Sequence, residues 1–238
     1  MRYAVYSTAA EGTGLAGTAA EWLGRNAFDG FSLRQPDLSW LDAEALSALT
    51  ADPRRYGFHG TLKAPFTPLE SVDRADLHRL LDQVASETAP IDRPEGLAVS
   101  RLGPFFALVP AVPSQALNAL AGRCVTEFEP FRAPLTEADL ERRRRAGLTP
   151  QQDANLVRWG YPYVFDAFRF HMTLTGVVPY GLQVPMEMEL KTRFAPFTDR
   201  PTRIDTLALF VQSARDEPFV VERTVTLAGA GMAAGSRS

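Results

Sequence analysis

The sequence predicts a mixed α+β fold built on antiparallel sheet. Strand-like and helix-like segments alternate irregularly, several strand-like segments follow one another with short turns, and no repeat with a period of about 20–50 residues is visible. A doubly wound parallel sheet would instead need a helix between successive strands. The length of 238 residues allows one or two domains and is sufficient for a real core.

Strand segments are identified by β-branched and aromatic residues bounded by turn residues. In chain order they are Tyr3–Thr8, Phe58–Pro65, Leu97–Arg101, Phe105–Val109, Phe168–Val177, Arg203–Gln212 and Phe219–Thr226. Each of these segments is expected to pair with a neighbour in an antiparallel sheet.

Helices are predicted where apolar residues recur at spacings of three and four. In chain order they are Leu15–Gly24, Ala43–Leu49, Arg74–Glu87, Ser114–Phe128, Glu137–Arg145, Pro150–Trp159 and Pro185–Arg193. Asp73 and Thr136 supply start signals for the third and fifth. We expect one domain over 1–227 with a helical insertion at about 129–160, followed by a disordered tail at 228–238.

Composition excludes several classes of protein. A formal net charge of -3 provides no basic field, so nucleic acid is not an expected partner. The one cysteine, Cys124, excludes a disulfide framework and a multi-cysteine zinc site, and it indicates a reducing, cytoplasmic location. Cys124 itself is expected to be a small buried apolar residue. No run approaches the roughly 20 apolar residues of a membrane-spanning helix, so no membrane partner is expected.

One short motif occurs twice and contains two of the three histidines. Phe58-His59-Gly60-Thr61-Leu62 and Phe170-His171-Met172-Thr173-Leu174 share the pattern Phe-His-x-Thr-Leu, and their histidines are 112 residues apart. The chance that two of three histidines are followed by x-Thr-Leu is on the order of 10⁻⁴. The repetition makes His59 and His171 the leading candidates for catalytic residues.

Strand alternation places the polar residues of each motif on one face. Side chains two residues apart face the same side of a strand, so each histidine shares a face with its threonine, Thr61 or Thr173. The apolar residues between them face the core. The same alternation places Lys63 beside Thr61, and Arg169 and Thr175 beside the second motif, unless a β-bulge rotates them away.

These side chains together suit an anion of the phosphate type. Hydroxyl and cationic groups bind phosphate oxygens, so Lys63 and Arg169 are candidate substrate-binding residues. Two imidazoles can serve as general base and general acid. A metal held by the two histidines is an alternative, but no third ligand stands at a recognisable spacing. No metal and no cofactor are therefore expected.

The motifs and their surroundings resemble a known family. Two His-x-Thr motifs are the signature of the 2H phosphoesterase superfamily, and the sequences at 52–66, 159–165 and 168–176 are similar to its DUF1045 branch. The resemblance covers most of the chain, from Arg2 to Val211. It implies two pseudo-symmetric lobes of antiparallel sheet with helices around a central cleft. The branch usually has Ala at Gly60; since this residue faces away from the cleft, little effect is expected.

The resemblance also implies metal-independent hydrolysis of a cyclic phosphodiester. One neutral histidine takes a proton from water, the other donates a proton to the leaving oxygen, and Thr61 and Thr173 bind the non-bridging oxygens. Opposite protonation states predict a bell-shaped pH–rate profile. The branch is associated with phosphonate metabolism because its genes lie among carbon–phosphorus lyase genes. The expected substrate is thus a small phosphorylated metabolite, either a cyclic phosphate or a phosphonate-derived compound.

Two other functions stay open at this point. One is an RNA-end 2′,3′-cyclic phosphodiesterase, which would need a basic tract leading to the cleft. The other is a non-catalytic module that binds a phosphoryl ligand.

Several further residues have simpler interpretations. Tyr163, with Tyr161, is a candidate for stacking on a ring of the ligand, or for packing under a loop. His78 is expected at an exposed helical position. Arg142–Arg145 are expected on a solvated helix, with a lid over an anionic substrate as the alternative. Gly12-x-Gly14 lacks the rest of a phosphate-binding loop.

Overall fold

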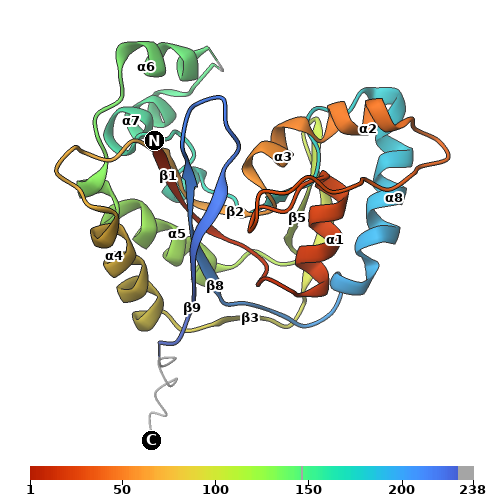
Figure 1. The fold of residues 1–238 in the computed structure, drawn as a ribbon, viewed down its shortest axis with the longest axis horizontal. Helices are drawn as coiled ribbons and strands as arrows, with labels where there is room; N and C mark the ends of the chain where they lie inside the picture. Colours follow the sequence, from red (N-terminus) through yellow and green to blue (C-terminus); the bar gives the residue numbers. More distant parts are fainter. Residues whose placement is uncertain (146, 230–238) are drawn as a thin grey trace, which may run out of the picture.

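The computed structural model describes residues 1–145 and 147–229 and shows a mixed α+β fold (Figure 1). The strands are β1 (Arg2–Ser7), β2 (Gly60–Phe66), β3 (Ile91–Arg93), β4 (Leu97–Leu102), β5 (Phe105–Pro110), β6 (Met172–Thr173), β7 (Thr202–Ile204), β8 (Thr206–Gln212) and β9 (Val220–Thr226). The helices are α1 (Gly14–Leu23), α2 (Ala43–Leu49), α3 (Ala51–Tyr56), α4 (Arg74–Glu87), α5 (Gln115–Glu127), α6 (Glu137–Arg144), α7 (Pro150–Trp159) and α8 (Gln183–Phe194).

Within the described residues, the main sheet has seven strands in the order β4-β5-β6-β2-β1-β8-β9, and β3 pairs with β7 in a second sheet. Every paired strand is antiparallel to its neighbour. The predicted α+β class with antiparallel sheet is therefore confirmed.

Most predicted helices and strands agree with the structure to within one or two residues, but one strand is much shorter than predicted. The segment Phe168–Val177 forms only the two-residue strand β6. The backbone leaves the ladder after Thr173 because the N–H groups of Leu174 and Thr175 both donate to the carbonyl oxygen of Phe106. The structure also divides the predicted strand Arg203–Gln212 into β7 and β8 at Asp205.

The two faces of the central strand β1 pack into two different apolar clusters. Tyr3 and Val5 of β1 pack into the main apolar cluster with Leu81 of α4 and Leu120 of α5. Tyr6, on the opposite face, belongs to a smaller cluster with side chains of β8 and the segment before β9. This second face of β1 therefore lies away from α4 and α5, and it is the face on which the candidate site is found.

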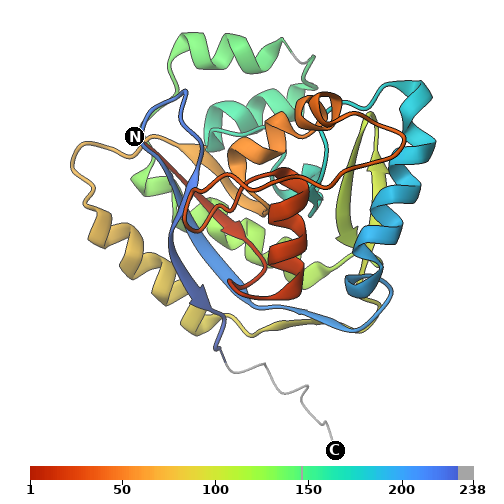
Figure 2. The same cartoon turned by 45° about the vertical axis from the view of Figure 1, so that its right-hand side comes forward.

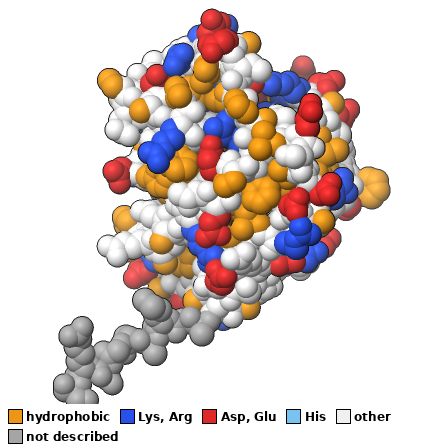
Figure 3. Space-filling view, turned by 90° about the vertical axis from the view of Figure 1, so that its left-hand side faces the viewer, with side chains coloured by type: hydrophobic (Ala, Val, Ile, Leu, Met, Phe, Trp, Pro, Cys, Tyr) orange, Lys and Arg blue, Asp and Glu red, His pale blue; other side chains and the backbone are white. Residues whose placement is uncertain are grey.

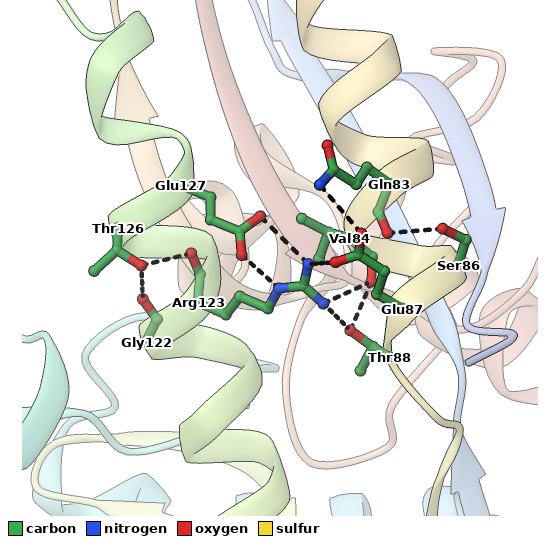
Figure 4. A network of polar contacts seen from close by, with 9 residues as sticks. All are labelled: Gln83, Val84, Ser86, Glu87, Thr88, Gly122, Arg123, Thr126 and Glu127. Atoms are coloured by element: carbon green, nitrogen blue, oxygen red, sulfur yellow. Dashed lines mark hydrogen bonds and ion pairs between the residues drawn. The ribbon is translucent and has the colours of Figure 1, made fainter. Parts of the chain in front are cut away.

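Helices α4 and α5 are joined by a polar network beneath the sheet (Figure 4). Arg123 of α5 donates from Nε to Glu127 Oε1 (2.5 Å) and from Nη1 to Thr88 Oγ1 (3.1 Å), and it also pairs with Glu87 of α4. Helix α5 packs directly against β2. The network therefore helps to hold the strand that carries the first motif.

Helices α6 and α7 form the region expected to be an insertion. In Figures 1 and 2, α6 lies at the upper end of the molecule with α7 beneath it. Thr136 caps α6 by accepting from the N–H of Asp139, and Thr149 forms a capping box with Gln152 at the start of α7. Both helix starts are encoded locally.

On the face shown in Figure 3, basic and acidic side chains lie close to one another among apolar ones. Elsewhere in the described residues, Arg223 of β9 and Asp82 of α4 form an ion pair (2.9 Å). Among the helices of residues 1–145 and 147–229, none has the length and apolar character required to cross a bilayer.

Two predictions on chain organisation remain. Most of the tail predicted at 228–238 falls on 230–238, which lie outside the described residues. Ala228 and Gly229 are described, and their N–H groups donate to the carbonyl oxygens of Ala85 and Thr88 (3.0 and 2.9 Å), so the chain is still anchored to the end of α4 at this point. The single domain over 1–227 stays a prediction.

Candidate active site

A cavity of about 680 Å³ contains both repeated motifs. His59 and Thr61 line it from the first motif, and His171 and Thr173 from the second. The structure therefore brings together the four residues that the sequence predicts as catalytic. Their catalytic roles stay a prediction.

Strand pairing explains why the motifs meet. Gly60 is the antiparallel partner of Met172, at the point where β2 joins β6. In antiparallel register the residues on either side of this pair lie opposite one another, so His59 faces Thr173 and Thr61 faces His171. All four side chains point to the same face of the sheet because they alternate with the paired residues.

The opposite face of both motifs is buried, as alternation predicts. Phe58, Leu62, Phe170, Met172 and Leu174 are all less than 10% exposed. Gly60 lies under the ring of Phe170, and a Cβ atom added there would come within 2.5 Å of Cε2 and Cζ of that ring. Ala at this position would therefore require the Phe170 ring to shift.

His59 is held in one tautomer. Its Nδ1 lies 2.8 Å from the carbonyl oxygen of Gly57, which can only accept, so Nδ1 carries the proton. Its Nε2, 3.1 Å from Thr61 Oγ1, is then an acceptor. The ring stacks on Tyr6 with centroids 3.7 Å apart. Burial lowers the pKa of His59 to about 4, and the charge of His171 adds to this effect. The imidazole is therefore neutral near pH 7.

His171 has the same backbone anchor. Its Nδ1 lies 2.7 Å from the carbonyl oxygen of Arg169, so this nitrogen also donates to the backbone two residues earlier. The ring centroid lies 5.8 Å from that of Phe105 in β5. In both motifs the backbone thus fixes Nδ1, and in His59 the other nitrogen, Nε2, accepts a hydrogen bond from Thr61 within the cavity.

Lys63 does not reach this cavity. It is buried, and its Nζ donates to the carbonyl oxygen of Val125 (3.0 Å) and to Glu129 Oε2 (2.5 Å). The cause is a register shift: Tyr6 is opposite Thr61, but Val5 is opposite Lys63, so β2 carries an extra residue at Leu62. The prediction that Lys63 binds substrate in the cleft is therefore not met by the geometry.

Arg169 and Tyr163 lie beside the main cavity rather than in it. Both line an adjoining space of about 260 Å³ that shares Thr61 and His171 with the main cavity. Arg169 is exposed, and its Nη1 donates to the carbonyl oxygens of Phe168 (2.7 Å) and Asp166 (3.1 Å). Thr175, placed on the cleft face by alternation, is instead buried and accepts from the N–H of Phe106 (2.9 Å).

Five arginines also line the main cavity, together with Tyr6, Tyr56, Tyr161, Ala64 and Pro65. The arginines are Arg2, Arg55, Arg142, Arg143 and Arg215. Arg142 and Arg143 come from α6. Arg142 is exposed, as expected for a solvated helix, but Arg143 is half-buried with a buried Nε, so the expectation is wrong for Arg143. Arg144 of the same helix instead pairs with Asp153 of α7 (2.6 Å).

Three of these arginines were not identified from the sequence. Arg55 stands four residues before His59, and its position beside the first motif was the only available signal. Arg2 and Arg215 come from the start of β1 and the turn between β8 and β9. Nothing in the pattern around them indicates a site, because they are brought together by sheet pairing between distant segments.

The other predicted residues lie elsewhere. His78 is half-buried on α4, and its Nε2 lies 2.7 Å from Glu222 Oε1 of β9. Cys124 is fully buried, as predicted, and burial raises the pKa of its thiol to about 12. Among residues 1–145 and 147–229, no three His, Cys, Asp or Glu side chains form a group that could hold a metal ion.

Comparisons with known proteins identify relatives along the chain. A model of the family described as "Protein of unknown function (DUF1045)" matches residues 61–220. A protein of Janthinobacterium sp. (strain Marseille), named ribose 1,5-bisphosphate phosphokinase PhnN, is 37% identical over 237 residues. A protein of the same name from Laribacter hongkongensis (strain HLHK9) is 32% identical over 232 residues. Both alignments cover 97% of this chain but 51% and 53% of the relatives, so the chain spans about half their length.

Solved structures align over nearly the whole chain at low identity. LigT of E. coli complexed with 3′-AMP is 12% identical, with a TM-score of 0.47, over 95% of this chain and 97% of LigT. TT0787 of Thermus thermophilus is 14% identical, with a TM-score of 0.45, over 97% of this chain and 100% of TT0787.

Proposed function

This chain belongs to the DUF1045 family, and on that premise we propose that it is a metal-independent phosphoesterase that hydrolyses a small cyclic phosphate or a phosphonate-derived metabolite. One observation carries the proposal: two His-x-Thr motifs, 112 residues apart in sequence, line one cavity together with five arginines. Imidazoles can supply general acid–base catalysis, and hydroxyl and guanidinium groups can bind phosphoryl oxygens.

We assign the general base to His59. Its Nδ1 is committed to the Gly57 carbonyl, so Nε2 carries a lone pair. Its lowered pKa, about 4, keeps this lone pair available near neutral pH. In the proposed reaction, Nε2 takes a proton from the water molecule that attacks phosphorus.

His171 is then the general acid. Its Nδ1 is anchored in the same way, to the Arg169 carbonyl, so a proton on Nε2 points to the cavity when the ring is charged. As water attacks, one P–O bond of the cyclic diester breaks, and His171 donates a proton to the leaving oxygen. The product is a phosphomonoester with a free hydroxyl group.

Thr61 and Thr173 bind the phosphoryl group between the two imidazoles. The antiparallel pair of Gly60 and Met172 has a local twofold axis, so one histidine and one threonine lie on each side of it. This arrangement suits a reaction in which water attacks phosphorus from one side and the leaving oxygen departs from the other. The arginines stabilise the charge that develops on the non-bridging oxygens.

The kinase activity in the relatives' names is proposed to reside in the half of their length that this chain does not match. A P-loop needs a Gly-Lys pair followed by Ser or Thr. The chain has two lysines, Lys63 and Lys191, which follow Leu62 and Leu190. Incubation with ATP and ribose 1,5-bisphosphate is accordingly expected to give no phosphoryl transfer. A reducing, cytoplasmic location is also proposed, supported by the one buried cysteine.

The proposal is tested by hydrolysis of nucleoside 2′,3′-cyclic phosphates and ribose cyclic phosphates in EDTA. The wild type should open at least one of these rings, and His59→Ala and His171→Ala should not. Activity that requires added metal, or equal activity in all three proteins, would overturn the proposal. A preference for RNA ending in a cyclic phosphate over every small substrate would assign the alternative RNA-end function instead.

A further inference from the structure

The main cavity holds more positive charge than one phosphodiester requires. A cyclic phosphodiester carries a single negative charge, and the two His–Thr pairs already supply its hydrogen bonds. Five arginines line the same cavity, and none of its lining residues is acidic within the described part of the chain. One carboxylate outside this lining, Asp139, pairs with two of the five arginines, Arg142 and Arg215. The remaining guanidinium groups repel one another, so the cluster is stabilised when an anion binds.

Three of these arginines have no carboxylate partner within residues 1–145 and 147–229. They are Arg2, Arg55 and Arg143. The Nε atoms of Arg55 and Arg143 are buried and make no hydrogen bond in the described residues. Arg2 donates to the amide oxygen of Gln212 (2.7 Å), which leaves its charge uncompensated. Burial lowers the pKa of Arg2, and the charges of Arg215 and Arg55 lower it further. A bound anion would supply the missing partners.

Asp139 arranges the other two arginines at one end of the cavity. Its Oδ1 lies 2.8 Å from Arg142 of α6, and its Oδ2 lies 3.0 Å from Arg215 in the turn between β8 and β9. One carboxylate therefore holds two guanidinium groups from separate segments side by side. Because each keeps further N–H donors, the pair remains able to bind an anion.

These arginines extend away from the histidines. A neighbouring space of about 240 Å³ shares Arg2, Arg142, Arg143 and Arg215 with the main cavity. Neither His59 nor His171 lines this second space. Asp139 also lines this space, so the four shared arginines and one carboxylate lie on the side of the cavity that leads away from the two histidines.

We propose that this arginine cluster (Arg2, Arg142, Arg143 and Arg215) binds a second phosphoryl group of the substrate, so that the substrate class is a small cyclic phosphodiester with a separate phosphomonoester. This inference rests on the proposed function and specifies its substrate. The cavity of about 680 Å³ has the size of small-molecule sites, which favours a metabolite over a polymer.

The test compares two probes that differ only in the second phosphate: uridine 2′,3′-cyclic phosphate with a 5′-hydroxyl group or a 5′-phosphate. For the wild type we expect a kcat/KM at least about tenfold higher for the 5′-phosphorylated probe than for the 5′-hydroxyl probe, mainly through a lower KM. The reason is that charge-assisted hydrogen bonds are among the strongest. In Arg143→Gln this preference should fall to about twofold or less. Arg144→Gln, which alters the neighbouring arginine paired with Asp153, should keep the preference.

Binding of the reaction products separates this inference from the catalytic proposal. By calorimetry, uridine 3′,5′-bisphosphate should bind the wild type at least about tenfold more tightly than uridine 3′-monophosphate, and Arg143→Gln should remove most of the difference. Tight bisphosphate binding without any ring opening would overturn the proposed function alone. Equal kcat/KM for the two cyclic probes together with equal product affinities would overturn the second phosphate site alone. An RNA end preferred over the 5′-phosphorylated probe would also overturn it.

Discussion

Gly60 and Met172 are antiparallel partners at the junction between β2 and β6, and each stands between the histidine and threonine of its motif. An antiparallel pair has a local twofold axis, which here relates His59 to His171 and Thr61 to Thr173. The repeated sequence thus becomes a symmetric site because the residue between histidine and threonine is the residue that pairs.

Gly60→Ala tests this junction. The added methyl group would meet the Phe170 ring at 2.5 Å, so the ring or the strand must shift. We expect the free energy of unfolding to fall by about 1–3 kcal/mol, measured by urea denaturation. Gly17→Ala in α1, where a Cβ meets nothing within 4 Å, is the control and should be neutral or stabilising. The Gly60→Ala/Phe170→Leu double variant should be more stable than Gly60→Ala. If Gly60→Ala itself loses no stability, the Phe170 ring does not pack tightly on Gly60.

The protonation of His59 can be followed directly. Because its pKa is lowered to about 4 from the ordinary 6.5, an NMR titration of its ring should show a midpoint near pH 4. As the proposed base it must be neutral, so kcat/KM should decline below about pH 4 and contribute the acid limb of a bell-shaped profile. A midpoint near 6.5 would contradict the buried environment described for this ring.

The same shift predicts a pH dependence of stability. Between pH 6.5 and 4 the unfolded chain binds a proton at His59 and the folded chain does not, so stability falls as pH falls through this window. The loss is about 3 kcal/mol at pH 4 relative to pH 7. In His59→Gln this contribution is absent, so the decline of unfolding free energy should be correspondingly smaller than in the wild type. Identical declines of the unfolding free energy in the two proteins would contradict the lowered pKa of His59.

Lys63→Met separates structure from substrate binding. The ammonium group lies in the interior, on Glu129 and the Val125 carbonyl, outside the main cavity. Glu129 keeps Arg132 as a partner (2.6 Å), so we expect a loss of about 1–3 kcal/mol in stability with KM unchanged within about twofold. A large rise in KM without a loss of stability would instead indicate that Lys63 binds the substrate.

The two His-x-Thr motifs could be located from the sequence because each is defined by neighbouring residues. Histidine and threonine two residues apart share a face of any strand, and the repetition marks both halves of the site. Local patterning also located α2, α4 and α7 with their observed bounds. These features depend on periodicity and capping within one segment.

Features that depend on distant pairing could not be obtained in this way. The extra residue at Leu62 is defined only by the register of β2 against β1, and it moves Lys63 into the interior. Arg2 and Arg215 line the same cavity as His59 only because β1, β2 and β8 are neighbours in the sheet. The solvated-helix expectation for α6 failed at Arg143 for the same reason, since its guanidinium group lies over the ring of Tyr161, which is on another segment.

The most direct measurement of the central claim is the rate of ring opening, in EDTA, by wild type, His59→Gln, His171→Gln and the double variant, with His78→Gln as control. His78 of α4 pairs with Glu222 outside the cavity, so its variant should keep the wild-type rate. If the two histidines act in one step as base and acid, each single variant loses about 10²–10⁴-fold in kcat and the double variant falls much less than the product of the two losses predicts. Full activity in either single variant would contradict the account.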